Sequence, residues 1–150
     1  AANQFRHFFI SFGFDDLPSK RRFMTIICAG ITAIMLIYSL TPFYQWVWGT
    51  VMGLPAELIS IARDATLIMC LMPAIIIYRN YFHAHLMMMR RTGGMAYGSI
   101  LRVGGIYACA HVCFSLGWLS PVNATLILIL GFVIEAVIAQ FTFRQANAHK

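Results

Sequence analysis

The chain has 150 residues and a net charge of +6, yet 60% of its residues are hydrophobic and only 11% are charged. A soluble domain carries about 25% charged residues, so this composition leaves too little polar surface for a globule in water. Lipid is therefore the expected solvent, and the length allows about four membrane-spanning helices of roughly 20 residues each. The basic residues lie at the ends of apolar segments and not along one folded face, which argues against nucleic-acid binding.

The N-terminal segment, residues 1–22, has a helical pattern of aromatic residues. They recur at i, i+3, i+4 and i+7, and are Phe5, Phe8, Phe9 and Phe12. This spacing predicts a short amphipathic helix lying in the membrane interface, with a disordered tail as the alternative. Pro18 ends the pattern, and a basic cluster at 20–22 precedes the first apolar run.

Four apolar segments follow. We expect an all-α integral membrane protein with transmembrane helices over about 23–47, 56–81, 96–118 and 122–143 and a cytoplasmic tail over 144–150. Pro42 is expected to kink or end the first span, and Pro73 to bend the second, because proline removes a helix hydrogen bond and crowds the preceding turn. The sizeable connection between the second and third spans contains Arg90, Arg91 and Thr92.

The third predicted span is rich in small residues. Gly94 and Gly98 form a GxxxG pair, and Gly105, Cys109 and Cys113 continue the four-residue spacing. Small residues let helix backbones approach closely in lipid. We therefore expect this helix to pack against neighbouring helices along that face.

The basic residues predict the orientation. Nine of the 11 Lys and Arg residues lie in the N-terminal segment, in the 79–95 region or in the C-terminal tail. They are Arg6, Lys20, Arg21, Arg22, Arg79, Arg90, Arg91, Arg144 and Lys150. The two opposite turns contain none. Basic residues accumulate on the cytoplasmic side, and an even number of spans puts both ends of the chain on one side, so both termini are predicted to be cytoplasmic.

Ionisable residues inside the spans are the candidates for chemistry, because a charge in the bilayer core is costly and normally faces a partner or water. They are Arg63, Asp64, Arg102, His111 and Glu135. At about 1.5 Å of rise per residue, their depths predict two polar layers, one of Asp64 with His111, with Arg63 as a further candidate, and one of Arg102 with Glu135. These pairs either neutralise each other and fix helix register, or take part in moving protons, ions or a polar headgroup.

No cofactor, metal site or enzyme activity is expected. The histidines considered for haem, His83, His85 and His111, do not place two members on different spans at one depth. The four cysteines form no C-x-x-C pair, and no activated nucleophile, phosphate loop or pair of catalytic carboxylates is visible.

The stretch from Gly53 to Gly105 carries a family resemblance. Pro55 and Glu57 open an amphipathic helix start, Pro73 bends the span, and Arg91 with Thr92 stand in the short loop before a span rich in small residues. This arrangement resembles a recurring unit of the MATE-like flippase and exporter superfamily, including its ankylosis-protein-like members, although Gly93 follows the Thr where the family has a Gly before the Arg.

The resemblance implies a twelve-helix transporter of two six-helix halves, of which this chain would correspond to helices three to six of one half. We therefore expect a transporter or flippase-like module in a bacterial inner membrane, working with other subunits or copies of itself or as part of a larger protein. The alternative is a non-catalytic subunit of a larger membrane complex, such as an energy-transducing or photosynthetic assembly.

Overall fold

The computed structural model describes residues 7, 10–11 and 17–148, and this part of the chain is helical with no strand. The elements in chain order are α2 (Leu17–Leu40), α3 (Phe43–Gln45), the π-helical turn η2 (Trp46–Val51), α4 (Ala56–Met69), α5 (Met72–Met88), α6 (Gly93–Ser115) and α7 (Pro121–Ala148). The predicted N-terminal helix depends on Phe5, Phe8, Phe9 and Phe12, which lie outside the described residues.

Among the described residues, three helical stretches are long and apolar enough to cross a membrane: Pro18–Leu40, Ala56–Met88 and Pro121–Ala148. They match the first, second and fourth predicted spans. Helix α6 has 23 residues but is not among them. Arg102, His111 and several glycines lower its hydropathy, so its place as a fourth span stays a prediction.

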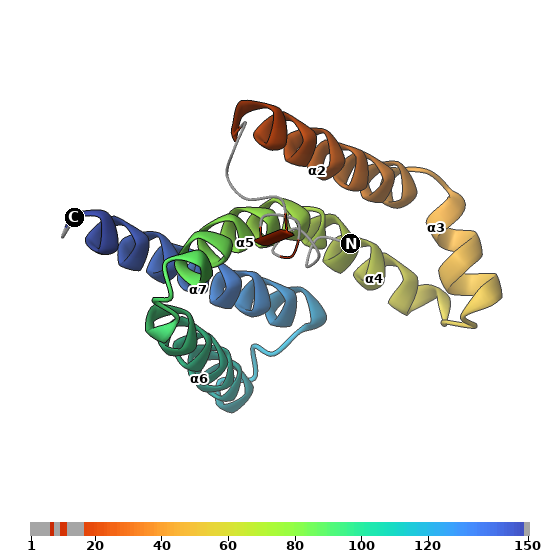
Figure 1. Cartoon of the computed structure of the whole chain (residues 1–150). Helices are drawn as coiled ribbons and strands as arrows, with labels where there is room; N and C mark the ends of the chain where they lie inside the picture. Colours follow the sequence, from red (N-terminus) through yellow and green to blue (C-terminus); the bar gives the residue numbers. More distant parts are fainter. Residues whose placement is uncertain (1–6, 8–9, 12–16, 149–150) are drawn as a thin grey trace.

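Prolines set the limits of the first span. Helix α2 begins at Leu17, before the predicted start at residue 23, and it contains Pro18 in its first turn. A proline costs nothing there because its missing N–H would have had no helical acceptor. The helix ends at Leu40, before the predicted end at 47, because Pro42 disfavours a helical residue before it. Beyond it, α3 and η2 turn away from the axis of α2 (Figure 1).

The second predicted span is two helices joined at a bend, as expected from Pro73. Cys70 and Leu71 separate α4 from α5, and their N–H groups donate to carbonyls three residues back, at 3.2 Å in each case. Pro73 lies in the first turn of α5. Helix α5 then continues to Met88, well past the predicted end at residue 81.

Helix α7 is the centre of the packing and contacts α5, α6 and α4. Helix α2 lies on the other side of α4 and α5 from α7 and touches them sparsely (Figure 1). The start of α2, the turn from α5 to α6 and the end of α7 all lie toward the same end of the molecule (Figure 1).

Only part of the predicted small-residue face makes the α6–α7 contact. Gly94 lies against Thr142, and a Cβ on Gly98 would lie 3.5 Å from Glu135 Cγ. Gly105, by contrast, has no atom within 4 Å of where its Cβ would be, and Cys109 is exposed. Cys113 is only half-buried. The close-packing face therefore includes Gly94 and Gly98 but ends before Gly105.

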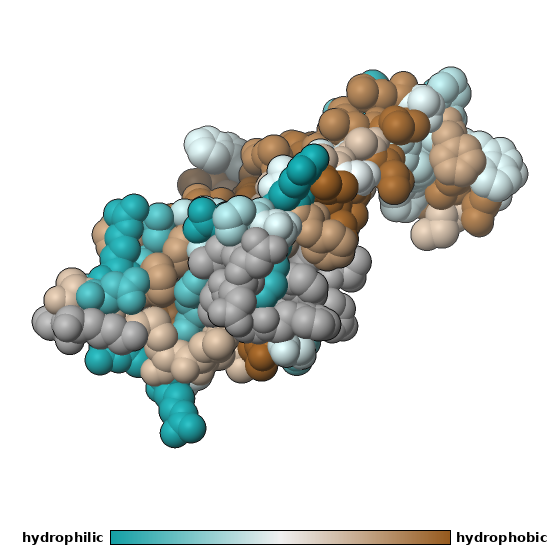
Figure 2. Space-filling view, turned by 45° about the horizontal axis from the view of Figure 1, so that its top comes forward, coloured by the Kyte–Doolittle hydropathy of each residue, from teal (hydrophilic) through white to brown (hydrophobic). Residues whose placement is uncertain are grey.

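The surface of the helices is strongly apolar. Ile34 is 69% exposed, Ile100 69% and Tyr107 75%. Hydrophobic residues spread across the middle of the visible face, and hydrophilic residues gather over the end where α7 finishes (Figure 2). Such exposure would be costly in water but is normal for helices solvated by lipid.

Candidate functional site

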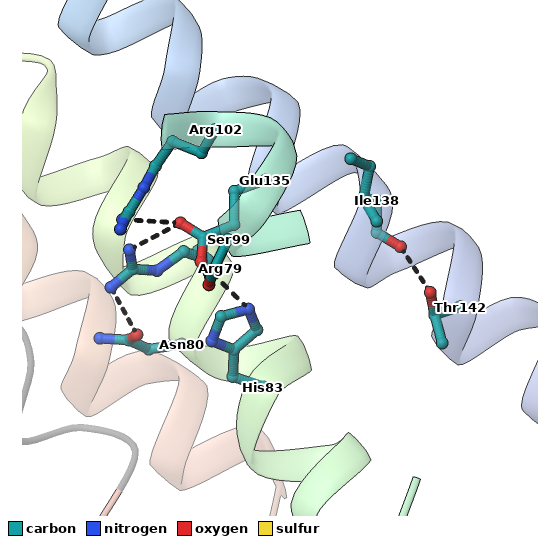
Figure 3. A network of polar contacts seen from close by, with 8 residues as sticks. All are labelled: Arg79, Asn80, His83, Ser99, Arg102, Glu135, Ile138 and Thr142. Carbon is teal, nitrogen blue, oxygen red and sulfur yellow. Dashed lines mark hydrogen bonds and ion pairs between the residues drawn. The ribbon is translucent and has the colours of Figure 1, made fainter. Parts of the chain in front are cut away.

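Polar side chains from three helices converge on one carboxylate between α5, α6 and α7 (Figure 3). Glu135 comes from α7, while Ser99 and Arg102 come from α6, three residues apart and thus on one helix face. Arg79 and His83 come from α5 and are four residues apart, which also places them on one face. We call these five residues the Glu135 cluster.

Glu135 accepts hydrogen bonds on both of its carboxylate oxygens. Arg79 Nη1 donates to Oε2 at 3.0 Å, and Arg102 Nη1 donates to the same oxygen at 2.9 Å. Ser99 Oγ donates to Oε1 at 2.8 Å. His83 Nε2 lies 3.9 Å from Oε1, near enough for an electrostatic contact but too far for a hydrogen bond.

The cluster is well shielded. The side chain of Glu135 is 2% exposed, that of Arg79 is 10% exposed and that of Arg102 is 23% exposed. The ring of Phe132 covers both guanidinium groups, at 5.1 Å from Arg79 Cζ and 4.6 Å from Arg102 Cζ. Cations are attracted to the face of an aromatic ring, so Phe132 adds a second, weaker partner for each arginine.

Two guanidinium groups share one carboxylate in the cluster, and both stay charged because arginine remains protonated in proteins. Asn80 Oδ1 accepts a further hydrogen bond from Arg79 Nη2 at 3.2 Å. A change at Glu135 therefore removes the carboxylate that both guanidinium groups share.

The pairing predicted between Arg102 and Glu135 is present. The sequence did not lead us to predict Arg79 and His83 as partners of Glu135, because Arg79 stands where the apolar stretch of the second predicted span ends. The sequence did contain a usable sign: Arg79, Asn80 and His83 follow an i, i+1, i+4 spacing within a helix that continues to Met88. A polar face in mid-helix is more informative than a polar residue at a helix end.

The second predicted layer, Asp64 with His111, is not formed. Both residues are exposed, and no ion pair joins them within the described part of the chain. Asp64 lies on α4, which packs mainly against α7 and α2, whereas His111 lies on α6, which packs mainly against α7. His111 instead stacks on Tyr107 of its own helix, with ring centroids 6.3 Å apart.

Arg63 binds the first span and not the predicted layer. Its Nε donates to the backbone oxygen of Ser39 at 3.1 Å, and its guanidinium lies over the ring of Tyr44, with Cζ 5.4 Å from the centroid. The carbonyl of Ser39 lies in the last turn of α2. Arg63 therefore caps the end of that helix, where a positive charge is favourable.

The loop residues Arg90, Arg91 and Thr92 are exposed in the turn from α5 to α6. Arg90 has φ 54°, and the N–H groups of Arg90 and Arg91 donate to Met87 and Leu86 at 3.0 and 2.9 Å. This pair of bonds is a Schellman helix end, with Arg90 at the left-handed position that glycine usually occupies. At the end of α6, the equivalent position holds Gly117 with φ 70°.

Metal-binding residues do not gather in the described part of the chain, which contains no group of three or more His, Cys, Asp or Glu side chains. Of the histidines considered for haem, His83 belongs to the Glu135 cluster and His85 Nδ1 lies 2.9 Å from the backbone oxygen of Tyr81. His111 lies on a different helix, on an exposed face.

No protein-family model, curated protein or solved structure matches the chain. The resemblance to the MATE-like superfamily therefore depends on the motifs between Gly53 and Gly105 alone.

Proposed function

We propose that the chain is a four-span module of a transporter or flippase of the MATE-like type, acting with partner subunits, with copies of itself or as part of a larger protein. It would lie in a bacterial inner membrane with both termini cytoplasmic. Support comes from the three described helices that are long and apolar enough to cross a membrane and from the length of α6. The start of α2, the turn from α5 to α6 and the end of α7, where basic residues concentrate in the sequence, also lie toward one end of the molecule (Figure 1).

The Glu135 cluster is the observation that carries the proposal. If its charges served only to neutralise one another, one arginine would suffice for one carboxylate. Instead two guanidinium groups and His83 surround Glu135. Ionisable side chains gathered in this way among apolar helices are costly to bury and are typical of proton, ion or substrate pathways.

The chemistry follows from competition for the guanidinium groups. While Glu135 is ionised, it occupies Arg79 and Arg102. When Glu135 takes up a proton, its hold on them weakens, and an anionic group on a cargo can bind them in its place. Proton uptake by Glu135 and binding of an anionic group by the arginines would therefore be coupled, because both occur at one site. The site has contacts to α5, α6 and α7, and these contacts would transmit the change to all three helices.

Reconstitution into proteoliposomes tests the proposal with two probes. One is a fluorescent phospholipid whose outward movement is scored by dithionite quenching, and the other is an internal pH-sensitive dye. We expect movement of lipid or protons by the wild type, at least a tenfold slower rate in Glu135→Gln (roughly the loss of one charged hydrogen-bond partner), and an unchanged rate in Asp64→Asn. A folded Glu135→Gln protein that retains the full rate would show that the cluster has a structural role only.

The second candidate, a non-catalytic subunit of a larger membrane complex, is favoured by the outer face of α6. Gly104 and Gly105 have open space around them, and Cys109 is exposed on the same helix. Small residues on an uncovered helix face suit the docking of another helix. Native mass measurement after mild extraction discriminates the two: a stable complex with unrelated proteins supports the subunit, and a small homogeneous oligomer stabilised by substrate supports the transporter.

A further inference from the structure

An open apolar groove of about 600 Å³ separates α2 from α5. Its volume lies within the roughly 300–1,000 Å³ that ligand pockets usually span. Met24 and Cys28 of α2 face Ile77 and Phe82 of α5 across it. Ala29 and Ala74 are exposed along the same groove, so small side chains stand where larger ones would have closed it.

One end of the groove carries a fixed positive charge. Arg21 lines it there, and its Nη2 donates to the hydroxyl of Tyr81 at 2.7 Å, with Cζ 5.3 Å from the ring centroid. Tyr81 is a neutral partner. Every ion pair between described residues involves the carboxylate of Glu135, so Arg21 forms no ion pair with a described carboxylate. Most of the five guanidinium donors remain available to an anion.

The dimensions of the groove match one leaflet of a bilayer. Its lining along α2 runs from Arg21 to Thr32. Eleven residues of helix rise by about 16 Å. This is close to half of the hydrocarbon core, which is about 30 Å thick. A chain that starts at a headgroup beside Arg21 and follows the groove would therefore end near the bilayer midplane.

We propose that this groove binds an anionic phospholipid, with one acyl chain along the apolar lining and the phosphate against Arg21. The charge of Arg21 selects an anionic over a zwitterionic headgroup, whereas its neighbours Lys20 and Arg22 do not line the groove. The bound lipid would link α2 to α5 where direct contacts are few. This site is separate from the Glu135 cluster and does not depend on transport.

Native mass spectrometry of the full chain in detergent tests the site with dioleoyl phosphatidylglycerol, dioleoyl phosphatidylcholine and glycerol 3-phosphate. We expect one phosphatidylglycerol to bind about tenfold more tightly than phosphatidylcholine, from the loss of one charge-assisted contact. Ala29→Phe, which fills the groove, should abolish this binding, and Arg21→Gln should weaken it about tenfold. The matched controls Ala33→Phe and Arg22→Gln, which do not line the groove, should bind as the wild type does.

A second measurement uses the unaltered protein, so it does not depend on the folding of a variant. Phosphatidylglycerol with a photoreactive acyl chain should crosslink to Met24–Thr32 and Ala74–Phe82, and not to the exposed face of α6 around Ile100. Equal retention of phosphatidylcholine, unchanged binding by Ala29→Phe, or crosslinks spread evenly over α6 would overturn the proposal. Displacement of the lipid by an equal concentration of glycerol 3-phosphate would also overturn it, since the site would then be a free-anion site.

Discussion

In the part of the molecule built from α5, α6 and α7, a charged cluster and close-packed glycines set the helix contacts. Helix α2, by contrast, meets α5 along an open groove, and hydrogen bonds from Arg21 to Tyr81 and from Arg63 to Ser39 join it to α5 and α4. Lipid competes equally well for apolar side chains, so apolar character alone does not hold helices together in a membrane. The comparison teaches that specific polar contacts and steric fit, not apolarity, decide which helices form a unit. Four substitutions test it, in order of falling effect.

Glu135→Ala should be the most damaging change, because it removes the buried carboxylate that the buried Arg79 and the half-buried Arg102 share. Removing one partner of a buried ion pair costs about 3–5 kcal/mol. The free energy of unfolding, measured by denaturant titration in micelles, should fall by that amount. Glu57→Ala, at an exposed carboxylate in the first turn of α4, is the control and should change little. Equal effects of both changes would contradict the assigned role of the cluster.

Gly131→Ala tests whether helix packing is tighter between α6 and α7 than around α2. A Cβ at this position of α7 would lie 2.6 Å from Ile106 Cδ1 and Cγ1, so the Ile106 side chain must change its position or α6 must shift. Overpacking of this kind costs about 1–3 kcal/mol. Gly30→Ala on α2, where no atom lies within 4 Å of the new Cβ, is the matched control. It should stabilise the helix by up to about 1 kcal/mol. A thermal unfolding midpoint that falls equally in both variants would show that the two regions are equally packed.

Arg90→Gly, in the turn between α5 and α6, should stabilise the part of the molecule built from α5, α6 and α7. A non-glycine residue in the left-handed conformation costs roughly 1–2 kcal/mol, and glycine removes that cost. Gly117→Ala at the end of α6 makes the reverse change at a matched position and should destabilise by a similar amount. Calorimetry or denaturant titration should give shifts of opposite sign, and shifts of the same sign would refute the Schellman assignment.

Asp64→Asn should have the smallest effect. Asp64 is exposed and forms no ion pair within the described residues, so the free energy of unfolding should change by less than about 0.5 kcal/mol. The same titration used for Glu135 measures it. A loss comparable to that of Glu135→Ala would restore the predicted layer of Asp64 with His111.

The depth of a residue along its predicted span was enough to pair some of the polar candidates but not others. Arg102 and Glu135 were paired correctly because they lie at similar depth on helices that are neighbours. Asp64 and His111 were also predicted to lie at similar depth, but both side chains are exposed, and the main contacts of α4 and α6 are each with α7. Depth along a helix is readable from residue number, whereas the rotation of the helix and the identity of its neighbours are not.

What the sequence by itself determined about this protein is local: helical segments, their apolar character, the interruptions at Pro42 and Pro73, and the costly charges within the spans. Each depends on a residue and its near neighbours in the chain. Only the tertiary structure decided that Arg79 and His83 of α5 join Glu135, and that Gly98 packs on α7 while Gly105 does not. These features depend on which helix faces meet, and such contacts join residues more than 30 positions apart.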